Sequence, residues 1–166
     1  MKKLKLKPLT ANHVDDFMTW ASDSNLTPYL MSKPYTSKEQ EVSFFANVVE
    51  KHPSFKGIFL GDHVIGSIIL GPDTNNEKAE LGYVLAMSWW GRGYGTEVIK
   101  LALQKSFDDL GIKKIKDHVD PANIASQKIL EKKGFQRERL LKDYVVQHGV
   151  VKDRYLYSIS QNSFKY

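Results

Sequence analysis

The sequence predicts an α/β fold with a single mixed central sheet flanked by helices. Segments that alternate apolar and polar residues, as strands do, are interspersed with segments whose apolar residues recur at helical spacing. In the second half, two helical segments connect consecutive strands, which favours parallel pairing between strands there. The predicted order is β-α-α-β-β-β-α-β-α-β-β, and 166 residues suit one domain, 1–166.

The first half of the chain supplies one strand, two helices and a hairpin. Thr36-Ser37-Lys38-Glu39 matches a capping box and predicts the start of the second helix. Gly61-Asp62 is typical of the turn between two strands. The predicted segments are a strand Lys2–Pro8, helices Thr10–Asp23 and Ser37–Lys51, and strands Phe55–Leu60 and Val64–Leu70.

The second half alternates strands with helices and closes on a hairpin. Gly111 and Gly134 are suited to end helices, and Asp120-Pro121 predicts an N-cap followed by the first helical residue. His148-Gly149 predicts the final turn. The segments are strand Ala79–Met87, helix Gly93–Leu110, strand Ile112–Val119, helix Pro121–Lys133, and strands Phe135–Gln147 and Val150–Ser160.

Composition excludes several kinds of chemistry. The chain has no cysteine, so disulfides, thiolate nucleophiles and thiolate zinc sites are excluded. The histidines are scattered, without the helical spacing of a ligand pair, and we expect no metal. They are His13, His52, His63, His118 and His148.

The net charge of +5 is compatible with nucleic acid, a membrane surface or an anionic cofactor as partner. Lysine clusters such as Lys113–Lys116 are not interleaved with aromatic residues that would stack on bases. We therefore expect no nucleic acid; a basic binding module stays an alternative that steep salt dependence would reveal. No apolar run follows the first residues, so we expect no membrane and a cytoplasmic protein.

The most informative segment is Trp89-Trp90-Gly91-Arg92-Gly93-Tyr94-Gly95-Thr96, which joins a strand to a long helix. Glycines at alternate positions let backbone N–H groups approach a ligand closely. Together with the helix N-terminus, these donors favour an anion such as a pyrophosphate. Arg92 can add charge at the rim, and Thr96 can donate its hydroxyl or cap the helix. A turn without a ligand is the alternative.

Other phosphate-binding loops fit this segment poorly. The chain has no Gly-x-x-x-x-Gly-Lys-Ser/Thr run, so a P-loop is excluded. A dinucleotide fingerprint would require glycine or alanine where Thr96 or Val98 stands.

Two motifs resemble the GNAT superfamily of N-acetyltransferases, in its RimJ/RimL-like branch. Trp90–Glu97 is similar to the acetyl-CoA pyrophosphate loop, with Trp90 replacing the usual polar residue. Asp120–Phe135 resembles the Asn-x-x-Ser helix that ends in Gly-Phe. The resemblance covers nearly the whole chain and implies the acyl-CoA N-acyltransferase fold and acetyl-CoA as co-substrate.

The resemblance implies a role for each matched residue. The pantetheine arm of acetyl-CoA would pair with the backbone of Val84, Leu85 and Ala86, with an N–H near Leu85 holding the oxyanion. Asn123 would bind the same arm. The pyrophosphate would meet backbone N–H groups of Gly91, Arg92, Gly93, Tyr94, Gly95 and Thr96.

The reaction is transfer of an acetyl group to a primary amine, which must be neutral to attack. The resemblance implies Glu80 as general base. The tyrosine that many members use as acid is replaced by Leu130. Ser126, on the same helical face as Asn123, takes that place next to the cofactor.

The acceptor side is predicted less sharply. Tyr29, Tyr35 and Tyr83 are candidates for binding the amine, and packing in the core is the alternative for each. A peptide N-terminus and a small amine both remain open, as do monomer and homodimer. The alternative function is a non-catalytic acyl-CoA-binding or regulatory domain of the same fold.

Overall fold

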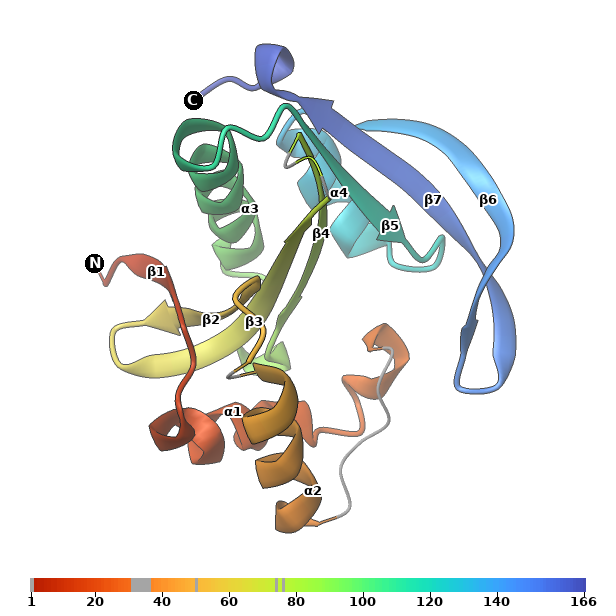
Figure 1. Ribbon diagram of the computed structural model, residues 1–166. Helices are drawn as coiled ribbons and strands as arrows, with labels where there is room; N and C mark the ends of the chain where they lie inside the picture. Colours follow the sequence, from red (N-terminus) through yellow and green to blue (C-terminus); the bar gives the residue numbers. More distant parts are fainter. Residues whose placement is uncertain (1, 31–36, 50, 74, 76) are drawn as a thin grey trace. The chain divides into compact units, whose positions relative to one another are not determined.

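The computed structural model describes residues 2–30, 37–49, 51–73, 75 and 77–166, and within these the predicted order of strands and helices is confirmed (Figure 1). The described strands form a sheet in the order β1-β2-β3-β4-β5-β7-β6. The helices are α1 Val14–Ala21, α2 Lys38–Phe44, α3 Tyr94–Gln104 and α4 Ile124–Lys132. The strands are β1 Leu4–Lys7, β2 Phe55–Leu60, β3 His63–Pro72, β4 Lys78–Leu85, β5 Lys114–Val119, β6 Gln136–Gln147 and β7 Val150–Ser160.

The chain folds into two compact units. The N-terminal unit consists of Met1–Ile69 and Tyr83–Tyr94, and the C-terminal unit consists of Leu70–Gly82 and Gly95–Tyr166. Each unit is described separately below. No helix among the described residues is both long and apolar enough to span a bilayer.

The N-terminal unit is built on antiparallel strands. β1 pairs with β2 from Leu4↔Leu60 to Lys7↔Gly57, and β2 pairs with β3 across the predicted turn, where Gly61 has a φ of +64°. The hairpin expected at Gly61-Asp62 is therefore confirmed. A core of apolar side chains packs against these strands, and Phe17, Trp20 and Phe45 provide its ring contacts. The buried members of this core are Leu9, Phe17, Trp20, Ala21, Leu26, Phe45, Val49, Phe59, Val64 and Ala86.

Both helices of this unit are less regular than the sequence predicts. The first predicted helix begins with a 3-10 turn at Ala11–His13 and continues as α1. α2 ends at Phe44 and is followed by a π-helical turn, Phe45–Val49. Its cap is Ser37, whose hydroxyl accepts the backbone N–H of Gln40 at 3.2 Å. The capping box predicted at Thr36 lies partly outside the described residues.

β5 is the central strand of the C-terminal unit. It pairs in parallel with the start of β4, from Lys78↔Lys114 to Glu80↔Lys116, and antiparallel with β7 on its other side. The parallel pairing of β4 with β5 confirms the expectation for the first strand-helix-strand connection. The expectation for the second connection is wrong, because β7 lies between β5 and β6 and pairs antiparallel with each of them. The parallel pairing with β5 ends at Glu80, whereas β4 continues to Leu85.

The start of α4 differs from the prediction. Asp120 was expected to cap the helix, but its carboxylate accepts the N–H of Ala122 at 2.8 Å in a preceding turn. Asn123 is the N-cap instead, and its side chain accepts the N–H of Ser126 at 3.2 Å. The helix therefore begins at Ile124. The N–H groups of its first turn need an acceptor, and the side-chain oxygen of Asn123 provides one.

The C-terminal hairpin, β6 and β7, is long and curved (Figure 1). Its tip is the predicted His148-Gly149, and both residues have positive φ, 51° and 79°. The register of β6 shifts twice against β7, once between Arg137 and Arg139 and once between Leu141 and Val145. Bulges of this kind bend a strand and redirect its side chains.

Candidate active site

The glycine-dense loop leaves β4 through a short 3-10 turn, Met87–Trp89, and ends where α3 begins at Tyr94. Gly91 and Gly93 have φ of +72° and +82°, values at which any side chain is strained. Apart from chain neighbours, no atom lies within 4 Å of the place that a Cβ would occupy at either glycine. Open, left-handed backbone ahead of a helix is the geometry that an anion cradle requires.

Aromatic contacts hold this loop in place within the N-terminal unit. The indole N–H of Trp90 donates to the carbonyl of Leu85 at 2.8 Å, and the Trp90 ring meets Tyr29 edge-on at 5.1 Å. The Trp89 ring meets Tyr94 at 5.7 Å, and the guanidinium of Arg92 lies over it at 5.1 Å. Arg92 is itself exposed, so its charge stays available at the rim of the loop.

The end of β4 has part of its backbone already engaged. Ala86 donates its N–H to the carbonyl of Ile65 at 2.9 Å, and its carbonyl accepts the N–H of Trp89 at 2.9 Å. β3 approaches closely here, because a Cβ at Gly66 would lie 2.2 Å from the carbonyl oxygen of Val84. Of the three residues predicted to pair with a pantetheine arm, Ala86 would have to give up a bond to offer its N–H.

Two further members of the predicted loop lie within α3. Gly95 is buried, and Thr96 stands inside the first turn, partly buried. Since α3 begins at Tyr94, Thr96 does not cap the helix, and donation of its hydroxyl is the reading that stays open.

Glu80 belongs to a polar cluster in the C-terminal unit. Its carboxylate lies 2.7 Å from Nδ1 of His118, which stands on β5. The imidazole of His118 stacks on the ring of Tyr144, with centroids 4.7 Å apart and planes 10° apart. The Glu80 side chain is 63% exposed and that of His118 only 15%. A carboxylate, an imidazole and a phenol ring thus come together from β4, β5 and β6.

Asp117 carries a second carboxyl group on the buried face of β5. It is 6% exposed, and burial, followed by the nearby charge of Glu80, raises its pKa well above the ordinary value for aspartate. A buried carboxyl of this kind holds its proton to higher pH than a surface aspartate does.

Asn123 and Ser126 meet at the start of α4. The Oδ1 atom of Asn123 is used as the helix cap, through the N–H of Ser126. The side-chain NH2 of Asn123 makes no hydrogen bond among the residues that the structure describes, which leaves two donors for a ligand. Capping and ligand binding by Asn123 are therefore compatible.

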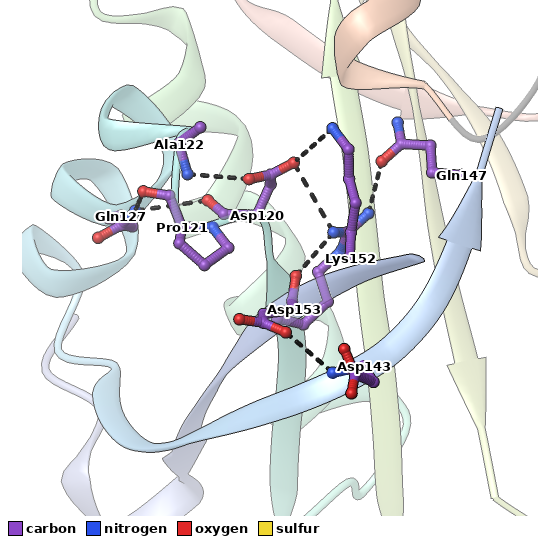
Figure 2. A network of polar contacts seen from close by, with 9 residues as sticks. Asp120, Pro121, Ala122, Gln127, Asp143, Gln147, Lys152 and Asp153 are labelled. Carbon is purple, nitrogen blue, oxygen red and sulfur yellow. Dashed lines mark hydrogen bonds and ion pairs between the residues drawn. The ribbon is translucent and has the colours of Figure 1, made fainter. Parts of the chain in front are cut away.

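A network around Asp120 fixes the segment that leads to Asn123 (Figure 2). The carboxylate of Asp120 lies 3.5 Å from Nζ of Lys152 and 3.7 Å from a guanidinium nitrogen of Arg154, both on β7. Gln127 of α4 donates to the carbonyl of Pro121 at 2.9 Å. These contacts tie the end of β5, the turn after it and α4 to one another.

The predicted acceptor residues have different surroundings. Tyr29 is 47% exposed and touches Trp90. Tyr83 is partly buried on β4. Tyr35 lies outside the described residues.

A cavity of about 320 Å³ opens within the N-terminal unit. Its wall combines indole rings, of Trp20 and Trp89, with the carboxylates of Asp16 and Asp23. One oxygen of Asp16 accepts the backbone N–H of Val64 at 2.6 Å. Within the part of the chain that the structure describes, no group of three or more potential metal ligands occurs.

His118, Asp117 and the stacking role of Tyr144 were not recognised from the sequence. The histidines are scattered along the chain without the spacing of metal ligands, so no local pattern singles out His118. A usable signal was the strand register. If the strands flanking α3 pair in parallel, Glu80 lies opposite Lys116, and His118 follows two residues later on the same face.

A model of the acetyltransferase (GNAT) domain matches residues 3–136. The chain belongs to this family. The N-acetyltransferase p20 of Bacillus licheniformis is 28% identical over 170 residues, which cover 98% of this chain and 96% of the relative. This GNAT protein is therefore an acetyltransferase by family.

Solved structures share the GNAT fold of the chain. A GNAT-family acetyltransferase from Bacillus anthracis has a TM-score of 0.87 at 19% identity, with 98% of both chains covered. A spermidine N-acetyltransferase from Vibrio cholerae, in complex with CoA and spermine, has a TM-score of 0.81 at 22% identity, with 96% of both chains covered. Likeness at these identities extends to the fold alone, which confirms the predicted fold class.

Proposed function

We propose that this GNAT protein transfers the acetyl group of acetyl-CoA to a primary amine by direct attack, with both substrates bound together. The observation that carries the proposal is the open backbone at Gly91 and Gly93, immediately before α3. A Cβ at either glycine would occupy the space in which a pyrophosphate oxygen meets the N–H groups. Membership of the GNAT family supports acetyl transfer as the reaction, and the geometry of the loop supports CoA as the carrier of the acetyl group.

The residues present fit a pyrophosphate and its arm. Backbone N–H groups from Gly91 to Thr96 would bind the pyrophosphate, and Arg92 would add its positive charge. The backbone of Val84 and Leu85, and of Ala86 if it releases Ile65, would pair with the pantetheine arm. The free amide donors of Asn123 and the hydroxyl of Ser126 would complete the binding of this arm.

Bound acetyl-CoA supplies an acetyl group activated as a thioester. The protein must deliver a neutral amine to it, because an α-amine with a pKa of about 8 is neutral in roughly one molecule in ten near pH 7. The resemblance to the family assigns the uptake of the ammonium proton to Glu80, directly or through water. Ser126 is proposed to donate a hydrogen bond near the departing sulfur.

The acceptor is proposed to be either a peptide N-terminus or a small amine. The resemblance to the RimJ/RimL-like branch supports a peptide. The Vibrio cholerae neighbour, named for spermidine, supports including polyamines. Tyr29, Tyr35 and Tyr83 are proposed to contact the acceptor. We further propose that residues 1–166 act as one N-acetyltransferase domain, as a monomer or homodimer, in the cytoplasm.

Calorimetric titration with acetyl-CoA, followed by a free-thiol release assay, tests the proposal. The amine panel comprises peptides with different N-termini, spermidine, spermine and simple alkylamines. Binding together with amine-dependent thiol release is the expected result. The product identified by mass spectrometry then names the acceptor class.

Two other outcomes lead elsewhere. Binding without thiol release from any amine would favour a non-catalytic acyl-CoA-binding domain. Failure to bind acetyl-CoA at all would overturn the assignment of the loop. Titration with ADP separates the contribution of the pyrophosphate from that of the pantetheine arm. ADP should bind measurably through the pyrophosphate contacts alone, but more weakly than acetyl-CoA.

A further inference from the structure

We propose that His118 is the general base of the transfer reaction and that Glu80 is its positioning residue. This inference rests on the proposed function and deepens it. It follows from the cluster of β4, β5 and β6 side chains in the C-terminal unit, which the resemblance to the family did not indicate. It reassigns Glu80, the residue that the sequence suggested as base.

The contact between Glu80 and His118 determines which nitrogen is basic. An ionised carboxylate only accepts hydrogen bonds, so at 2.7 Å from Oε1 of Glu80, Nδ1 of His118 carries the proton and donates it. Nε2 then holds the lone pair. Within the described part of the chain, Nε2 of His118 makes no hydrogen bond. The carboxylate thereby orients the ring and stabilises the imidazolium that forms when Nε2 gains a proton.

Imidazole also suits the task better than an exposed carboxylate. Free imidazole has a reference pKa of about 6.5 and a free glutamate carboxyl about 4.3, so imidazole is the stronger base near neutral pH. The side chain of Glu80 is 63% exposed, whereas that of His118 is 15% exposed. Water therefore competes for Glu80 more than for His118.

Tyr144 and the bulge in β6 fix the plane of the imidazole. The two rings are nearly parallel, 10° apart, at 4.7 Å. Tyr144 lies inside the register shift between Leu141 and Val145, beside Asp143, whose φ is +51°. The N–H of Asp143 donates to a carboxylate oxygen of Asp153 at 2.9 Å, which anchors the bulge on β7. The anchored bulge thereby holds the ring of Tyr144 against the imidazole of His118.

Other charged groups lie near the pair in the sheet. Lys116 is the register partner of Glu80 on β5. Asp117 precedes His118 on the buried face of β5, and Asp120, which is paired with Arg154, follows the end of that strand. Glu80 and Tyr144 contact the imidazole from the strands β4 and β6.

The proposed transfer moves two protons from the acceptor nitrogen, one before and one after the attack. The ammonium group of the acceptor gives one proton to Nε2 of His118, which becomes an imidazolium held by Glu80. The amine nitrogen forms the new C–N bond to the acetyl carbon as the C–S bond breaks, and sulfur leaves with the electron pair. A second proton from the amine nitrogen neutralises the thiolate, and His118 returns its proton to water.

The test compares His118→Asn with Glu80→Gln and with a control, His52→Asn, at an exposed histidine of the N-terminal unit. Asparagine retains a donor near the position of Nδ1 but removes Nε2. We expect His118→Asn to lower kcat about 100-fold or more with the Kd for acetyl-CoA unchanged. Glu80→Gln should lower kcat less and move the acidic limb of the kcat/KM profile to lower pH, because the imidazolium loses its carboxylate.

Three results would overturn the proposal. The first is a folded His118→Asn variant with kcat within threefold of wild type. The second is a larger loss in Glu80→Gln than in His118→Asn, which would return the role of base to Glu80. The third, independent of turnover, is an NMR spectrum in which neutral His118 carries its proton on Nε2. Absence of thiol release from wild type with every amine would instead refute the proposed function, and this inference with it.

Discussion

Replacing Gly93 by valine tests the loop, and the structure allows the effect on folding to be separated from the effect on binding. Gly93 has a φ of +82°, a conformation that costs a non-glycine residue about 1–2 kcal/mol. No neighbouring atom stands within 4 Å of the new Cβ, so steric overlap adds nothing in the free protein. For a domain of this size we expect Tm to fall by about 2–8 °C, with the fold retained.

Binding of acetyl-CoA should suffer more than folding. The valine side chain fills the space in front of the loop and blocks at least one N–H group from a pyrophosphate oxygen. Loss of one hydrogen bond to a charged group costs about 1.5–3 kcal/mol. That corresponds to a rise in Kd of roughly 10- to 150-fold. Isothermal titration calorimetry measures it directly.

Gly111→Val is the matched control. Gly111 also has a positive φ, +67°, and open space around its Cβ position, but it lies in the turn before β5. Both variants should lose a similar amount of stability, and only Gly93→Val should lose affinity. An equal change in Kd for the two variants, or none in either, would refute the reasoning about the loop.

Three further substitutions address single contacts. Asn123→Ser keeps an oxygen that can cap α4 but removes the amide donors. Tm should therefore stay within about 1–2 °C of the wild-type value, while the Kd for acetyl-CoA rises about tenfold. A wild-type Kd by calorimetry would show that Asn123 only caps the helix. Trp90→Phe removes the donor to the Leu85 carbonyl and should lower Tm by about 2–4 °C; an unchanged melt would mean that water replaces the indole. Asp117→Asn should remove a pH dependence: the folded state raises the pKa of Asp117, so wild type loses stability as pH rises from about 4 through that pKa. Melts from pH 4 to 8 should diverge in favour of Asp117→Asn, and parallel curves would exclude Asp117 as the cause.

Local residue signals were sufficient to predict the order of elements and the glycine conformations. Gly91 and Gly93 have the positive φ that a close backbone approach requires, and Gly134 ends α4 with a φ of +94°. Strand alternation also located β2 and β7 with the bounds that the structure has. Each of these features depends only on a residue and its neighbours along the chain, so the sequence alone is enough to predict it.

Features decided by distant partners were missed. Asp120 and Asn123 both suit an N-cap, and the contacts of Asp120 with Lys152 and Arg154 on β7 decide between them. The pairing of Glu80 with His118 depends on a register between strands separated by α3. The bulge that brings Tyr144 onto His118 has no glycine to mark it.

The two register shifts make β6 longer than the stretch of β7 opposite it, Val150–Ser158. A hairpin in which one strand is longer bends toward the shorter strand. The extra residues of β6 therefore account for the curvature of the hairpin (Figure 1). The surplus in Lys142–Tyr144 comprises an even number of residues, so the side chains beyond it keep their faces. Removing one residue there would turn the side chains of Val145 to Gln147 to the opposite face. Removing two would reduce the curvature of the arm to that of the remaining shift at Arg137 and Arg139, and would leave those faces unchanged.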